Sequence, residues 1–269
     1  MNRPLSLAAL TVLDLSPADM VSCAAWAGYS HVGLRLNPAT PTEAHYPTIG
    51  DTPLIRDVLA RLQDTGVKVL DVEILRLKPD TLVTDFEAFF ETGSRLGAQH
   101  VLLAGNDPEH TRLVDNFAAT CDLAARYGLA AHLEPMPWTD VRNVAEADAI
   151  IRAAGRDNAG IIIDPIHFDR SGDTLAGLAD IPASRFRYMQ FCDAPAARPT
   201  STEEILFQAR AERLPPGEGG LPLRALLQAL PAGIALSIEV PQMALAQSVG
   251  PFERARRLRE ATEHVLATC

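Results

Sequence analysis

The sequence has little that would suit it to a nucleic acid or a membrane. Its formal net charge is −10, whereas a protein that holds a nucleic-acid backbone needs a basic surface. No stretch approaches the ~18 apolar residues of a membrane span. The apolar run near the start is interrupted at Asp14, too early for a secretory signal. We therefore expect no nucleic-acid partner, no membrane association and a cytoplasmic location.

Cysteine is also scarce and shows no pairing pattern. There are 4 cysteines and no CxxC spacing: Cys23, Cys121, Cys192 and Cys269. This usage predicts reduced, mostly buried thiols rather than a disulfide framework or a thiolate metal site. A glycine-rich loop after the first apolar run is missing as well, which argues against a nucleotide-binding open sheet.

What the sequence does contain is a regular alternation of short apolar runs and amphipathic stretches. Between the runs, helical periodicity extends from Ser16 to Gly28, Leu54 to Gly66, Phe86 to Gly97, Leu113 to Gly128 and Ala145 to Gly155. The expected strands span residues 5–12, 31–36, 67–75, 100–105, 128–134, 159–164, 185–192 and 234–240. Eight strand-helix units in 269 residues predict an α/β fold, a (β/α)8 TIM barrel.

We expect one domain over residues 1–269, because no linker or composition change divides the chain. The interval before the last strand is long and rich in proline and glycine. It predicts a loop near residues 194–222 that covers the mouth of the barrel. A doubly wound open sheet is the alternative architecture.

Oxygen-bearing side chains stand at the ends of four successive expected strands. They are Glu134, Asp164, Gln190 and Glu239. The carboxyl ends of barrel strands meet on one face, so these side chains are candidates to surround one cation. Oxygen donors without thiolate or imidazole favour Mn²⁺ or Mg²⁺, with Co²⁺ as an alternative. Each residue taken singly could instead be a capped or salt-bridged group at a loop edge.

A metal that chelates a carbonyl and a neighbouring hydroxyl would acidify the adjacent C–H and stabilise an enediolate. Glu134 and Glu239 come from separated strands, so they could address such a substrate from opposite sides. One would remove a proton and the other return it. The expected ligand is a small polyhydroxylated carbonyl compound.

Five further residues are candidate substrate contacts, each with a structural role as the alternative. They are His167, Arg170, Arg213, Glu218 and Arg35. His167 follows Asp164 by three residues and could also bind the metal. Arg213 and Glu218 lie in the expected covering loop. For Arg35 and Glu73, near the ends of the second and third strands, an ion pair lining the barrel is favoured over catalysis.

At these residues the chain resembles the xylose isomerase-like TIM barrel superfamily, which contains sugar phosphate isomerases and epimerases. The matching stretches are HLEPMP, GIIIDPIHFDRSG, YMQFCDAP, RLPPGEGGLPL and LSIEVP, most of the C-terminal half. The resemblance implies that Glu134, Asp164, Gln190 and Glu239 bind the metal. It also implies that His167 contacts substrate and that the two glutamates transfer protons.

One departure separates two chemistries. Many isomerases and epimerases of this group have His where this chain has Gln190, and the QFCDAP form looks more like a subgroup that includes 3-dehydroshikimate dehydratases. Metal-dependent isomerisation or epimerisation of a small sugar or ketose is therefore the first hypothesis, and dehydration of a cyclic hydroxy-keto acid the second. A barrel that binds a sugar-like ligand without turnover is the third. No phosphate site is evident, and oligomerisation is left open.

Overall fold

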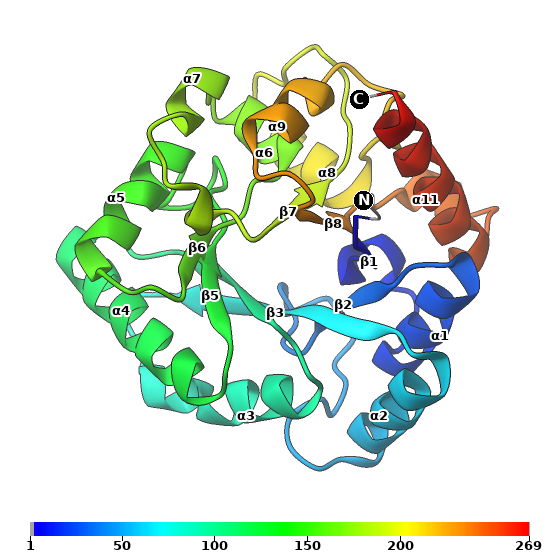
Figure 1. Ribbon diagram of the computed structural model, residues 1–269, viewed down its shortest axis with the longest axis horizontal. Coiled ribbons are helices and arrows are strands. Elements are labelled where there is room, and N and C mark those ends of the chain that lie inside the picture. Colours follow the sequence, from blue (N-terminus) through cyan, green and yellow to red (C-terminus); the bar gives the residue numbers. More distant parts are fainter. Residues whose placement is uncertain (1–2, 269) are drawn as a thin grey trace.

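The computed structural model describes residues 3–268 and shows a closed barrel of eight parallel strands (Figure 1). Seven neighbouring pairs form parallel ladders in the order β6-β5-β4-β3-β2-β1-β8-β7, and the ladders of β3 with β2 and β4 each contain a register shift. A parallel bridge between Ile163 and Met189 joins β6 to β7 and closes the ring. The strands are β1 (Leu5–Leu7), β2 (His31–Arg35), β3 (Lys68–Leu77), β4 (His100–Gly105), β5 (Ala130–Leu133), β6 (Ala159–Ile161), β7 (Tyr188–Phe191) and β8 (Ala235–Ile238). The predicted TIM barrel is thus confirmed.

Helices surround this ring on the outside (Figure 1). They are α1 (Pro17–Ala27), α2 (Pro53–Thr65), α3 (Glu87–Arg95), α4 (His110–Arg126), α5 (Val144–Ala154), α6 (Pro165–Arg170), α7 (Leu175–Leu178), α8 (Thr202–Ala211), α9 (Leu223–Ala229), α10 (Met243–Ala246) and α11 (Pro251–Ala267). Local signals fix several ends. The Ser16 side chain accepts from the Asp19 amide at the start of α1, and Gly28 ends the helix at φ 83°.

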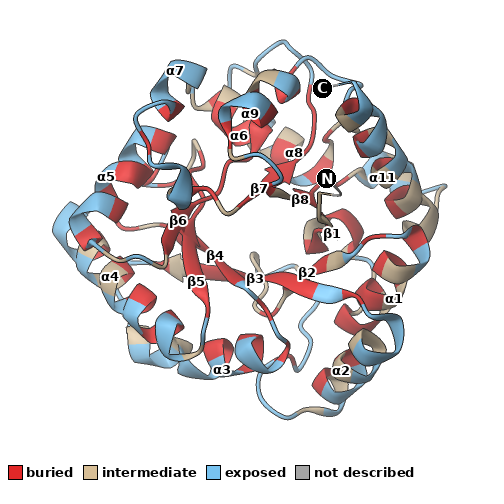
Figure 2. Cartoon of the chain, viewed as in Figure 1, coloured by how far each residue is buried: buried red, intermediate tan, exposed pale blue. Residues whose placement is uncertain are grey.

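Two apolar layers hold the barrel together. The larger lies between the strands and the helices, where the inner faces of the helices are buried (Figure 2). The smaller fills the barrel interior with Leu70, Ile74, Leu102, Ile162 and Tyr188. Strands covered on both sides explain why their sequences are almost continuously apolar.

The structure corrects the predicted first strand. β1 ends at Leu7, and Ala9–Val12 forms a 3-10 helix, η1. The reason is a contact far along the chain. The Thr11 hydroxyl donates to the Ile238 carbonyl at 2.8 Å and accepts from the Val240 amide at 2.9 Å. The turn therefore satisfies the end of β8, which no local pattern reveals.

The expectation of buried, unpaired cysteines is met where the structure describes them. Cys23, Cys121 and Cys192 are free and buried, while Cys269 lies outside the described residues. Over residues 3–268, every helix is too short or too polar to traverse a lipid bilayer.

Candidate metal centre and active site

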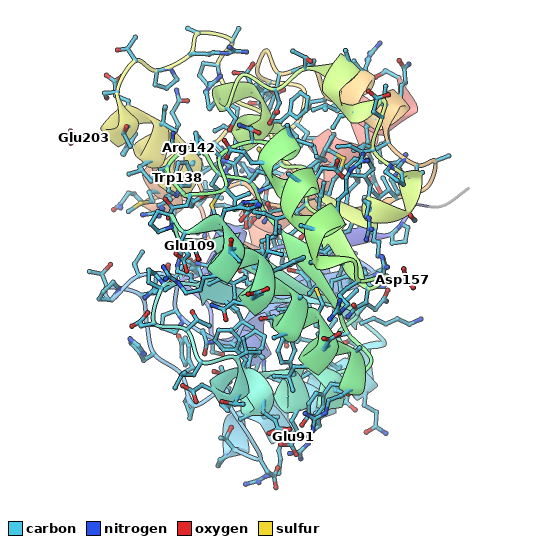
Figure 3. The ribbon with its side chains drawn as sticks, turned by 90° about the vertical axis from the view of Figure 1, so that its left-hand side faces the viewer. Glu91, Glu109, Trp138, Arg142, Asp157 and Glu203 are labelled. Carbon is cyan, nitrogen blue, oxygen red and sulfur yellow. The ribbon has the colours of Figure 1, made fainter. Side chains whose placement is uncertain are left out.

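The four strand-end residues converge on one end of the barrel. Glu134 follows β5, Asp164 follows β6, Gln190 lies in β7 and Glu239 follows β8. All four are at most 4% exposed. Glu134, Gln190 and Glu239 line a cavity of about 450 Å³, and Asp164 lies behind them. Trp138 also lines this cavity. In Figure 3 it lies on the opposite side of the molecule from Asp157, a residue of the loop that precedes β6.

His167 brings an imidazole to two of these carboxylates. Its Nε2 atom lies 3.6 Å from Glu134 Oε1 and 3.5 Å from Asp164 Oδ2. Candidate ligand atoms of Glu134, Asp164 and His167 all lie within 4.8 Å of one another. Burial lowers the pKa of His167 to about 4, although Asp164 opposes this shift. The imidazole is therefore neutral at pH 7, the form that ligates a metal or donates a single hydrogen bond.

Arg213 lies between the carboxylates of Asp164 and Glu239. Its Nη1 atom is 2.7 Å from Asp164 Oδ2 and its Nη2 atom is 3.0 Å from Glu239 Oε2. Nε donates to the Ala209 carbonyl at 2.7 Å, so the guanidinium is held from α8. Burial alone would raise the pKa of Asp164, but Arg213 and then His167 bring it below its ordinary value. One buried guanidinium thus pairs with two of the three buried carboxylates.

The two glutamates bind protons more readily than exposed glutamates do. Burial, then the charges of Glu239 and Asp164, raises the pKa of Glu134 well above its usual range. Burial raises the pKa of Glu239 to about 7, against the lowering effect of Arg213. Like charges in a buried cavity favour protonation or cation binding. Glu239 is therefore suited to exchanging a proton near neutral pH, and the shift of Glu134 has the same direction.

Part of the candidate donor set lies close enough together for one divalent cation, namely Glu134, Asp164 and His167. Gln190 Oε1 is buried and has no hydrogen-bond partner among the described residues, so an acceptor that points into the site needs a positive or donating partner. Together with the carboxylates of Glu134, Asp164 and Glu239 it offers oxygen ligands of the kind hard cations take. His167 adds one nitrogen.

Arg35 and Glu73 form the predicted ion pair, with Arg35 Nε 3.0 Å from Glu73 Oε1. Arg35 also reaches Glu43 Oε1 at 3.1 Å, and all three residues line the cavity. The structure places two other candidate substrate contacts elsewhere. Arg170 binds Asp169, the Pro195 carbonyl and Gln208, which fastens α6 to α8.

Glu218 is exposed and does not line the cavity. The segment around it turns away from the mouth because the amides of Gly217 and Leu221 both donate to the Asp193 carboxylate at 3.0 Å. Of residues 194–222, only the end of α8 and the residues just after it line the cavity, through Ala209, Arg210 and Arg213.

Sequence reasoning missed several lining residues, among them Arg76, Arg210 and Trp138. The Arg210 guanidinium lies 5.5 Å from the Trp138 ring centre, and that ring packs edge-on against His167 at 4.9 Å. Arg76 donates to Asn106 Oδ1 at 3.1 Å. Arg210 lies in the last turn of α8, whereas Arg213 follows the end of the helix at Ala211, so no helical spacing relates the two arginines.

We predict a pH-dependent difference in stability between the wild type and Glu239→Gln, both without metal. The pKa of Glu239 is about 7 in the folded protein and 4.5 by its ordinary value, so the folded state binds this proton more tightly than the unfolded state does. This difference raises the free energy of unfolding at low pH, and the contribution is lost as pH rises through 7. The variant should therefore gain about 1 kcal/mol relative to the wild type between pH 6 and 8. Urea unfolding in EDTA measures this. Buried histidines shift both proteins alike, so they cancel, and a constant difference would contradict the prediction.

Comparisons with known proteins add relatives of two activities. The chain is 28% identical over 185 residues to 3-dehydroshikimate dehydratase of Pseudomonas aeruginosa, covering 64% of the chain and 28% of that protein. It is 25% identical over 159 residues to inosose isomerase of Halalkalibacterium halodurans, covering 55% of the chain and 54% of that protein. The aligned parts therefore span between 28% and 54% of the length of these relatives.

Solved structures share the fold. A crystal structure of the IOLI protein with a bound zinc atom superposes with a TM-score of 0.80 at 20% identity, covering 98% of both chains. The probable 3-DHS dehydratase AsbF of Bacillus anthracis gives a TM-score of 0.74 at 13% identity, covering 97% of this chain and 98% of that one. A profile of the family described as xylose isomerase-like TIM barrel matches residues 21–267. The chain belongs to the xylose isomerase-like TIM barrel family.

Proposed function

We propose that the protein is a divalent-metal-dependent enzyme that removes a proton next to the carbonyl group of a small polyhydroxylated substrate. One observation carries the proposal: two buried carboxylates, an unpartnered amide oxygen and a neutral imidazole line one cavity, and a third buried carboxylate, Asp164, lies directly behind them. Glu134, Asp164, Gln190 and Glu239 would hold the metal, Mn²⁺ or Mg²⁺ by their chemistry. When bound, the metal supplies Lewis-acid polarisation of the carbonyl and lowers the energy of the enediolate.

The chain's own residues supply the proton transfers and the orientation. Glu134 and Glu239 reach the cavity from β5 and β8, so they approach a substrate from separate sides. The pKa of Glu239, near 7, suits a group that both takes up and releases a proton at neutral pH. Neutral His167 can donate to a substrate hydroxyl, and Trp138 packs against its ring.

The cavity arginines favour a substrate that carries a carboxylate. Arg76 and Arg210 line the cavity, and neither forms an ion pair with another described residue. Burial and then Arg210 lower the pKa of Arg76, so its charge is poorly compensated. Guanidinium groups recognise carboxylates well. We therefore infer that dehydration of a hydroxy-keto acid, the activity of the 3-dehydroshikimate dehydratase relative, fits this cavity best.

Isomerisation or epimerisation of a ketose is the second candidate. It is supported by the inosose isomerase relatives and by the two glutamates on separate strands, which suit removal and return of a proton. The two chemistries share the first proton removal and differ in whether a β-hydroxyl then leaves. A cytoplasmic location and association of copies remain predictions.

The test is to incubate the Mn²⁺-loaded protein in D₂O with 3-dehydroshikimate, inosose and simple ketoses. We expect 3-dehydroshikimate to give a conjugated product that absorbs in the ultraviolet, with no such product from the neutral compounds. Deuterium at the carbon next to the carbonyl of a neutral ketose, without loss of water, would instead support the isomerase. Metal binding with neither exchange nor elimination would contradict the proposed function.

A further inference from the structure

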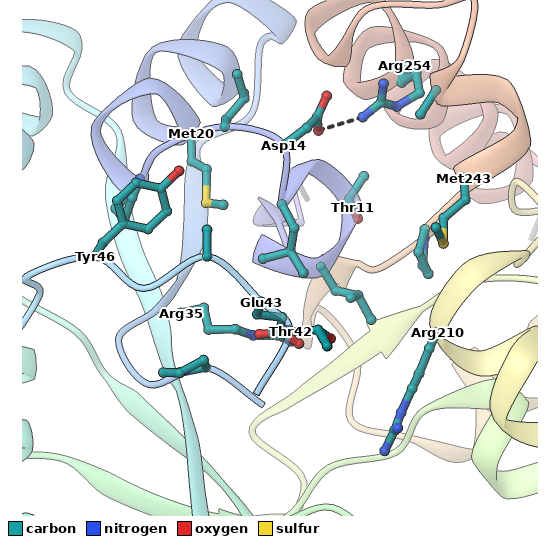
Figure 4. Close-up of a pocket in the computed structure, with 18 of the residues that line it drawn as sticks. Thr11, Asp14, Met20, Arg35, Thr42, Glu43, Tyr46, Arg210, Met243 and Arg254 are labelled. Carbon is teal, nitrogen blue, oxygen red and sulfur yellow. Dashed lines mark hydrogen bonds and ion pairs between the residues drawn. The ribbon is translucent and has the colours of Figure 1, made fainter. Parts of the chain in front are cut away.

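A second cavity of about 380 Å³ adjoins the metal cavity (Figure 4). It is enclosed by η1 and the segment leading to α1, the loop after β2, and the residues around α10. The two cavities have lining residues in common, which are Leu10, Leu13, Arg35, Thr42, Glu43, Arg210 and Met243. A molecule bound in one cavity can therefore extend into the other without crossing a strand of the barrel.

The walls that belong only to the second cavity are mainly apolar. They include Leu15, Pro17, Met20, Leu36 and Pro38, with the Tyr46 ring beside them. Figure 4 shows Met20 and Tyr46 on one side and Met243 on the other. A ligand group that enters this cavity gains by removing apolar surface from water.

Several polar groups that line this cavity already have partners. Asp14 pairs with Arg254 at 2.7 Å, the dashed contact in Figure 4. Thr48 donates to the Leu36 carbonyl at 2.5 Å, and Thr11 bridges the end of β8. A polar ligand group would find few partners here and would lose its hydration. The chemistry of the lining therefore selects an alkyl or aryl group.

Charged residues mark the junction between the cavities. Arg35 and Glu43 form an ion pair there, and Arg210 stands across from them with its guanidinium outside any ion pair to a described residue (Figure 4). A ligand that spans the junction would place hydroxyl or carboxylate groups at these side chains. Its polar part would then face Glu134 and Glu239, and its apolar part would face Met20.

We propose that the second cavity binds an apolar alkyl or aryl group carried by the substrate. The substrate is then a hydroxylated carbonyl compound joined to an apolar group, and the second cavity determines specificity for that group. This inference rests on the proposed function, because the metal cavity must hold the polar part.

The probe for the second cavity is 4-fluorobenzyl alcohol. Its binding to the Mg²⁺-loaded protein is measured from the line width of its ¹⁹F nuclear magnetic resonance signal. Ala246 lines the second cavity and is exposed on α10, so Ala246→Trp should fill the cavity without burying new charge. Ala244, exposed on the same helix, lines neither cavity, and Ala244→Trp is the matched control. We expect the ¹⁹F signal to broaden saturably, which gives the affinity of the probe. That affinity should fall about tenfold in Ala246→Trp and less than about twofold in Ala244→Trp.

Replacing Mg²⁺ by Mn²⁺ tests whether the probe sits beside the metal. We expect strong paramagnetic relaxation of the bound ¹⁹F nucleus, lost in Ala246→Trp. Electron paramagnetic resonance measures Mn²⁺ binding directly. If Mn²⁺ binds but does not relax the ¹⁹F nucleus of the probe, the inference that one substrate spans both cavities is wrong, while the proposed function stands. If Mn²⁺ does not bind, the proposed function is wrong, and the inference that rests on it is wrong as well.

Two further outcomes would overturn the inference. The first is absence of saturable probe binding, or equal weakening by both tryptophan variants. The second is a loss of probe binding as protein concentration rises, accompanied by dimers in sedimentation velocity. That result would mean that a second copy of the chain, rather than a substrate group, fills the cavity.

Discussion

Replacing Glu134 or Glu239 by glutamine is expected to lower turnover by at least about a hundredfold while the substrate still binds. Both side chains are buried and line the cavity, and both have a raised pKa. Glutamine keeps the shape and one carbonyl oxygen, so a metal ligand of the same kind remains, but it cannot exchange a proton. The loss should therefore appear in kcat rather than in KM, provided that chemistry is slower than substrate release.

Metal content must be measured alongside the kinetics, because each glutamate is also a proposed ligand. Assays at saturating Mn²⁺, with elemental analysis of the protein, separate loss of metal from loss of proton transfer. Glu218→Gln is the control, since this glutamate is exposed and away from the cavity. A variant that still exchanges the substrate C–H in D₂O without forming product identifies the other glutamate as the base. Turnover within about threefold of the wild type in both variants would contradict the assignment.

Most of the barrel could be predicted because its signals are local. Apolar runs mark the strands, while Ser16, Thr52 and Asn143 cap helices whose glycine stops are also visible in the sequence. The exceptions depend on distant contacts. The 3-10 turn at Thr11 exists because it binds the end of β8, more than two hundred residues later. α8 was hidden in a segment that composition alone marks as a loop.

The meeting of the four strand-end side chains was predictable to the same extent. Strand ends in a closed parallel barrel must meet, so Glu134, Asp164, Gln190 and Glu239 follow from the fold. Their immediate partners do not. That Arg213 bridges two of the carboxylates, while Arg76 and Arg210 are left to face the substrate, depends on how α8 packs over the mouth. Charge compensation is a property of the folded cavity, and sequence spacing does not determine it.

Removing the charge of Arg213 is expected to destabilise the metal-free protein by about 3–5 kcal/mol, because it leaves two buried carboxylates without their cation. The side chain is 2% exposed and bonds to Asp164 and Glu239 within 3.0 Å. Arg213→Met retains most of the volume without the charge. Urea unfolding in EDTA measures the loss. Arg213→Lys should lose less, because it keeps the charge but not the two-pronged geometry.

A divalent cation should reverse part of this loss, and that reversal distinguishes the site from an ordinary buried ion pair. Arg213 and a metal ion would share the same oxygens of Asp164 and Glu239, so adding Mn²⁺ should stabilise Arg213→Met more than it stabilises the wild type. Arg170→Met is the matched control. Its side chain is 1% exposed, but it pairs with Asp169 on the outer side of α6. Mn²⁺ should not rescue that variant beyond the wild-type gain. Equal gains in all three proteins would show that the carboxylates beside Arg213 do not hold the metal.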